Sequence, residues 1–164
     1  MIRDEEINRL IRYAQGMGLS VRFKPYNPKT KNAAEWVTDG SEVTVYVTSK
    51  CTKIDKILSL IHELAHHKAW IDNERQLDPK VEEALDSEEN KKIHRKRILD
   101  MEREESVYWE DIYKDTNCQF PIWKLNAQRE YDIWQYEVYY ESGKFPTKKE
   151  KARKKKELKK RHGQ

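Results

Sequence analysis

The spacing of apolar residues predicts four main helices. They cover residues 4–16, 55–70, 93–113 and 123–140, where apolar positions recur every three or four residues. The second helix is the most apolar of the four. Its apolar face is wide enough to be buried against a sheet and consists of Ile54, Ile57, Leu58, Ile61, Leu64 and Ala65.

Alternating apolar and polar residues predict a small sheet between the first two helices. Residues 34–38 and 43–48 read as two strands, and Asp39-Gly40 between them is a typical hairpin turn. Residues 19–23 read as a further strand. We therefore expect an α+β fold, with an N-terminal helix, a small three-stranded antiparallel sheet, an apolar helix and C-terminal helices.

Charge is unevenly distributed along the 164 residues, of which 38% are charged. Residues 148–161 contain ten Lys or Arg and two Glu, a balance of +8. The net charge is +4, so the remainder carries +4 minus +8, or −4. We expect a globular domain over residues 1–146 and a basic, disordered tail over residues 147–164, through which nucleic acid could be contacted.

The sequence gives no indication of a membrane or of a disulfide framework. It has no apolar leader and no apolar run near the roughly 20 residues that span a bilayer. Cys51 and Cys118 are far apart in the sequence and form no CxxC pair. We expect a cytoplasmic protein with no membrane partner.

The apolar helix carries His62-Glu63-Leu64-Ala65-His66, an HExxH motif. Residues four apart on a helix lie one turn apart on the same side, so His62 and His66 can present two imidazoles to one zinc ion. Zinc lowers the pKa of a water molecule, and Glu63 could then accept its proton. His67 points about 100° away from His66 and is expected to be a neighbour rather than a ligand.

A third ligand is expected on the third predicted helix, because a catalytic zinc usually has three protein ligands. Glu105 should lie on the apolar face between Met101 and Tyr108, where a carboxylate needs a partner that zinc would supply. Glu102, one position off that face, and His94 are the alternatives.

These residues resemble the ImmA/IrrE-type metallopeptidases, a branch of the zincins. A helix and a small sheet precede His-Glu-Leu-Ala-His-His, and a helix with a Glu ligand follows. In that family a small residue and then an aromatic follow this Glu, a pattern over which Glu105-Ser106-Val107-Tyr108-Trp109 can be laid. The resemblance covers about residues 1–115. It implies a minimal zincin-like fold, a zinc ion, and intracellular cleavage of a repressor or regulator protein.

Together these features predict a zinc metallopeptidase. Zinc would bind to His62, His66 and Glu105, and Glu63 would act as general base in hydrolysing a peptide bond of a protein substrate. A DNA-associated protease of the SprT kind, using the basic tail, is a second interpretation. A non-catalytic metal-binding protein that acts through protein contacts is a third, although the intact Glu63 favours an enzyme.

Overall fold

The computed structural model describes residues 4–28 and 33–163, which form two compact units. The first, which we call the sheet unit, consists of residues 4–28, 33–76 and 108–120. The second, the helical unit, consists of residues 77–107 and 121–163. The chain passes from one unit to the other after residues 76, 107 and 120, and none of these positions is the boundary expected after residue 146. The α+β class is confirmed, because a sheet and helices occur in separate parts of the sequence.

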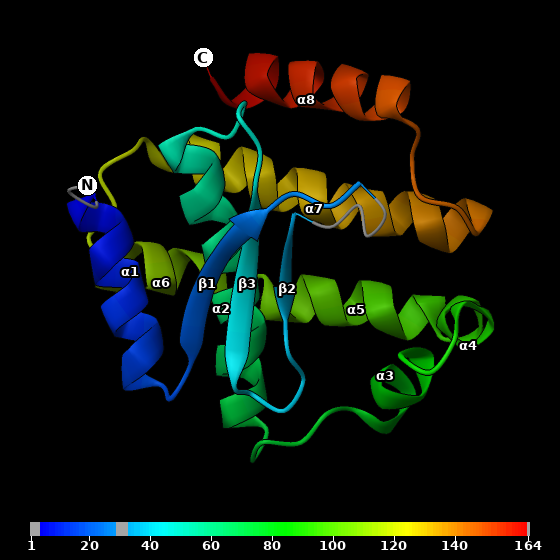
Figure 1. Ribbon diagram of the computed structural model, residues 1–164. Helices are drawn as coiled ribbons and strands as arrows, with labels where there is room; N and C mark the ends of the chain where they lie inside the picture. Colours follow the sequence, from blue (N-terminus) through cyan, green and yellow to red (C-terminus); the bar gives the residue numbers. More distant parts are fainter. Residues whose placement is uncertain (1–3, 29–32, 164) are drawn as a thin grey trace. The chain divides into compact units, whose positions relative to one another are not determined.

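The sheet unit places two helices against a small sheet. Helix α2 packs on strands β2 and β3, and helix α1 packs beside β1 (Figure 1). Helix α6 packs against α2. The elements of this unit are α1 (Glu5–Gly16), β1 (Ser20–Pro25), β2 (Ala34–Trp36), β3 (Glu42–Val47), α2 (Lys53–Asp72) and α6 (Tyr108–Asp115).

The sheet is mixed, so the prediction of an antiparallel sheet is wrong. The predicted hairpin is confirmed: β2 pairs antiparallel with β3, with Trp36 opposite Val43. Its turn contains Gly40 at φ +74°, and the Asp39 carboxylate accepts a hydrogen bond from the Ser41 N–H at 2.9 Å. Strand β1 pairs with the other edge of β3 and runs parallel to it. Apolar alternation identifies a strand and its faces but carries no information on the direction of its neighbour.

Helix α2 forms as predicted and extends slightly further at both ends. It begins with a capping box, in which Thr52 accepts a hydrogen bond from the Asp55 N–H and Asp55 accepts one from the Thr52 N–H. Its apolar face forms the core of the unit together with β3. The α2 side chains that are almost fully buried there are Ile57, Leu60, Ile61, Leu64 and Ala65.

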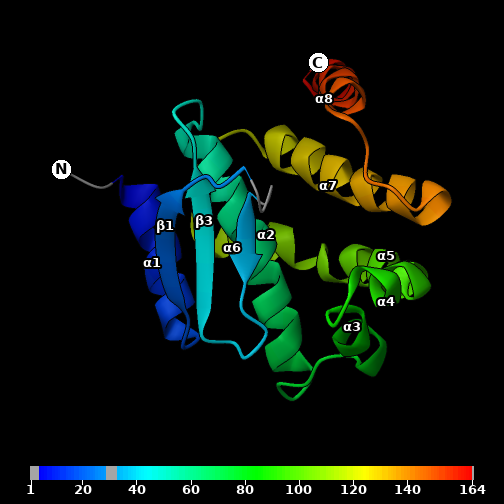
Figure 2. The same cartoon turned by 45° about the vertical axis from the view of Figure 1, so that its right-hand side comes forward.

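The helical unit is built around three long helices. Helix α7 (Ile122–Ser142) packs against α5 (Arg95–Glu105) and against α8 (Lys148–His162) (Figures 1 and 2). The short helices α3 (Pro79–Ala84) and α4 (Glu88–Ile93) pack on each other and contact α5. Gly143, at φ +75°, ends α7 in the left-handed conformation. Among the described residues, no helix is long and apolar enough to cross a membrane.

The single helix predicted over residues 93–113 is two helices, α5 and α6, separated at Ser106 and Val107. Ser106 ends α5, and its hydroxyl donates a hydrogen bond to the carbonyl oxygen of Arg103 at 2.8 Å. A serine hydroxyl bonded to a nearby carbonyl competes with continued helical bonding. The apolar periodicity continues across this break, and no glycine or proline marks it in the sequence. The sequence therefore predicted one helix where the structure has two.

The segment expected to be a disordered tail forms helix α8. Thr147 and Glu150 form a capping box at its start. Leu158 is only 2% exposed. The aliphatic stems of lysines can cover apolar surface while their ammonium groups stay in water, which allows so basic a helix to pack on α7.

Candidate metal centre

Helix α2 holds His62 and His66 side by side. Their ring centroids lie 4.9 Å apart, as expected for residues one helical turn apart. Both rings are half-buried within the sheet unit. The indole of Trp109, on α6, lies 5.3 Å from the His62 ring, and that of Trp36, on β2, lies 6.5 Å from the His66 ring. Both imidazoles therefore have an aromatic neighbour within the sheet unit.

The motif glutamate lies in the buried part of the same helix. Glu63 is 9% exposed and comes directly before Leu64, which is fully buried. A carboxylate in such a position is costly unless it has a hydrogen-bonding or charged partner. The position one residue after His62 directs Glu63 about 100° around the helix, beside the pair of histidines rather than between them.

His62 and His66 present two ligand-type nitrogens from the same side of α2. A catalytic zinc usually has three protein ligands, and two imidazoles with one carboxylate are a common donor set. The two histidines therefore fit two of the ligand positions of a zinc ion. The candidates for the third ligand are Glu102, Glu105 and His94, and all three belong to the helical unit. Glu102 is the most buried of them, at 7% exposed.

The two other candidates for the third ligand lie at the ends of α5. Glu105 is the half-buried last residue of α5. His94 lies between α4 and α5, where its Nε2 atom is 3.2 Å from a carboxylate oxygen of Glu83. Glu105 was expected to share a face with Tyr108, but the two residues lie in different helices.

His67 has a structural role within the sheet unit. It is 1% exposed, and its Nδ1 atom accepts a hydrogen bond from the indole N–H of Trp36 at 3.2 Å. Its Nε2 atom then carries the hydrogen and donates to the main-chain carbonyl of Met17 at 3.0 Å. Burial lowers the pKa of His67, which favours this neutral form. With both nitrogens bonded, His67 has none left for a metal.

Comparison of the chain with protein-family models, with curated proteins and with solved structures finds no match. The resemblance to ImmA/IrrE-type metallopeptidases therefore stays a prediction that rests on the motif and its surroundings. The case for a function depends on the chemistry of His62, Glu63, His66 and Glu102.

Proposed function

We propose that this protein is a zinc-dependent peptidase that hydrolyses peptide bonds of a protein substrate. The observation that carries the proposal is the HExxH motif of α2, which places the ring centroids of His62 and His66 4.9 Å apart in the most apolar helix of the described residues. Surface helices often contain histidines by chance, but this pair lies in a helix whose apolar face is buried, and the carboxylate of Glu63 between them in sequence is buried as well.

Each residue has a role that its chemistry supports. His62, His66 and Glu102 would hold the metal, with the two histidines fixed by their common helix. When bound, zinc polarises a water molecule and lowers its pKa toward neutrality. Glu63 would accept a proton from the attacking water and pass it to the leaving amine. The hydrophobic surroundings of α2 would limit access of bulk water and strengthen these electrostatic interactions.

The resemblance to the ImmA/IrrE type extends the proposal to a minimal zincin-like fold and to a regulatory role. On that basis the substrate is a repressor or regulator protein, and the site of action is the cytoplasm. These points rest on analogy with a family, whereas the metal site rests on this chain's own residues.

The zinc content and zinc affinity of point variants test which residues bind the metal. We expect about one zinc per chain in the wild type and none in the His62→Ala/His66→Ala double variant. Glu102→Gln should reduce zinc affinity by about 10-fold or more, whereas Glu105→Gln and His94→Gln should leave it unchanged. Equal zinc affinity in Glu102→Gln and the wild type would exclude Glu102. A wild type that binds no added zinc would refute the metal site altogether.

Catalysis needs a separate test, since a protein can bind zinc without cleaving anything. Mass spectrometry of a peptide library incubated with the zinc-loaded protein would identify cleaved bonds. Glu63→Gln should retain zinc but cleave at least about 100-fold more slowly, because it lacks the general base. Zinc binding without cleavage of any peptide, or equal cleavage by Glu63→Gln, would favour a non-catalytic metal-binding protein.

A further inference from the structure

Helix α8 presents a row of basic side chains on one face, which we call the basic stripe. The stripe consists of Lys149, Arg153, Lys156 and Lys160, all of them exposed. Their spacing of four, three and four residues places them along one side of the helix over about 16 Å. Leu158, the buried residue of α8, projects from the opposite side.

The stripe is only slightly neutralised within α8: hydrogen bonds from Thr147 lower the pKa of Glu150 most, and the charge of Arg153 adds to this effect. None of its four residues forms an ion pair with any carboxylate in the described part of the chain. The two glutamates of α8 are used elsewhere: Glu150 caps the helix, and Glu157 pairs with Lys154 at 3.3 Å and Arg161 at 2.8 Å. Like charges three or four residues apart repel one another on a helix, so an anionic partner would relieve this repulsion along the stripe.

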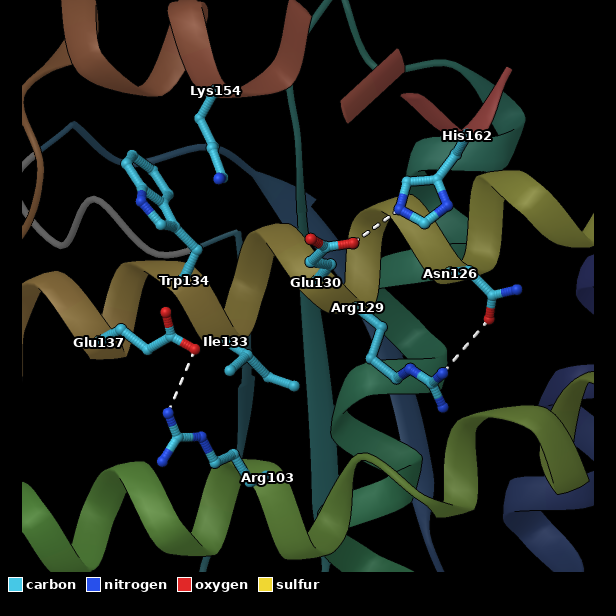
Figure 3. A pocket seen from close by; sticks show the side chains of 9 residues that line it. All are labelled: Arg103, Asn126, Arg129, Glu130, Ile133, Trp134, Glu137, Lys154 and His162. Atoms are coloured by element: carbon cyan, nitrogen blue, oxygen red, sulfur yellow. Dashed lines mark hydrogen bonds and ion pairs between the residues drawn. The ribbon is translucent and has the colours of Figure 1, made fainter. Parts of the chain in front are cut away.

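Contacts with α7 hold α8 in the orientation that exposes the stripe. The ring of His162 bonds a carboxylate oxygen of Glu130 at 2.6 Å, and the Lys154 ammonium lies 5.7 Å from the Trp134 ring centroid. Figure 3 shows these side chains bordering a pocket of about 540 Å³ within the helical unit. Arg161 also pairs with Glu130. Since the middle and the C-terminal end of α8 contact α7 and Leu158 is buried, the stripe on the opposite side faces away from that helix.

We propose that the basic stripe binds the phosphodiester backbone of nucleic acid without reading its base sequence. A row of cations matches a backbone that carries a negative charge at every phosphate. A membrane surface is a poorer fit, because interfacial helices insert an apolar face and Leu158 of α8 is buried against the protein. A protein partner usually requires large aromatic or apolar anchors, and the stripe has none.

The proposal is tested by fluorescence anisotropy with a labelled 20-base-pair duplex across a series of salt concentrations. One variant changes all four stripe residues to glutamine, which is a good helix former. A matched control removes four positive charges from exposed lysines that likewise lack ion pairs in the described residues: Lys24, Lys50, Lys80 and Lys92. Circular dichroism would check that both variants keep their helices.

The stripe variant should bind at least about tenfold more weakly at low salt than the wild type. Four phosphate contacts contribute about −3.6 to the slope of log K against log salt, so its slope should be shallower by roughly that amount. The control should bind within about twofold of the wild type. An arginine variant of the three stripe lysines should retain binding, which separates charge from helix stability.

Three results would overturn the proposal. The first is a wild type that does not bind the duplex at low salt. The second is a control variant that loses as much affinity as the stripe variant, which would indicate a general effect of net charge. The third is binding to phosphatidylserine vesicles but not to the duplex, which would assign the stripe to a lipid surface. None of these results depends on zinc, so the peptidase proposal can stand or fall separately.

Discussion

Replacing His67 with leucine would remove both hydrogen bonds of a buried imidazole. Trp36 donates to Nδ1 from strand β2, and Nε2 donates to the carbonyl of Met17 at the end of α1. His67 itself lies on α2. This one side chain therefore connects three elements of the sheet unit, and it lies beside His66 without belonging to the proposed metal site.

We expect His67→Leu to lower the free energy of unfolding by about 2–4 kcal/mol. Each hydrogen bond contributes about 1 kcal/mol net, and a buried partner left unsatisfied costs about 1–3 kcal/mol more. The Met17 carbonyl faces a side chain that is 1% exposed, so water cannot easily replace the imidazole there. Leucine has a similar volume, so the packing contribution should be small. His67→Asn keeps a hydrogen-bond acceptor near the Nδ1 position, so it should lower the free energy of unfolding by about half as much as His67→Leu.

Urea denaturation followed by circular dichroism would measure this loss. Both variants and the wild type should be compared with a chelator present, so that metal binding to the neighbouring His62 and His66 does not contribute. A His67→Leu variant whose stability is within about 0.5 kcal/mol of the wild type would refute the reasoning, because it would mean that the two bonds contribute nothing net.

Three further predictions concern other parts of the fold. Gly40→Ala should cost at least about 2 kcal/mol in thermal unfolding, because φ is +74° and the new Cβ would lie 2.3 Å from an atom of the Trp70 ring. Gly16→Ala, where nothing lies within 4 Å, should cost nothing, and equal losses would contradict this explanation. Leu158→Ala should weaken the docking of α8 by about 2–4 kcal/mol, and trypsin should then cut α8 sooner than in the wild type. Burial opposes ionisation of Glu130, but its bonds to basic groups of α8 lower its pKa below the usual value. The stability difference between wild type and Glu130→Gln should be present at pH 5.5 and disappear as pH falls well below 4.5. A difference that grows in acid would contradict this sign.

Local signals in the sequence identified most elements of the sheet unit. The hairpin was predictable because Asp39-Gly40 specifies its turn, and α2 because its apolar face is long and continuous. The pairing of β1 was not predictable in the same way. Parallel pairing with β3 depends on the path of the chain between strands, and alternation within one strand does not encode that path.

The candidate site was predictable only where its residues are close in sequence. HExxH places two ligands on one helix, so their proximity follows from helical geometry. The third ligand depends on where a distant helix ends, and the apolar pattern continues through Ser106 although the helix does not. Glu102 is more buried than Glu105, and the spacing of apolar residues along one helix does not predict such a difference.

Helix α8 shows why composition alone misled at the end of the chain. The high density of positive charge in this segment is typical of a disordered chain. A capping box and a single buried leucine are nevertheless sufficient to dock it when α7 supplies Tyr131 and Trp134 for the lysine stems to cover. A small number of specific contacts is therefore enough to order a segment whose composition predicts disorder.

The strand order of the sheet has a further consequence, for self-association. With β3 in the centre, β1 and β2 are both edge strands, whose outer backbone groups could template the pairing of another copy of the chain. Strand β2 is only three residues long. Strand β1 carries exposed Arg22 and Lys24 and ends at Pro25, which has no N–H to donate. Both edges, as the described residues form them, are therefore poor templates for aggregation.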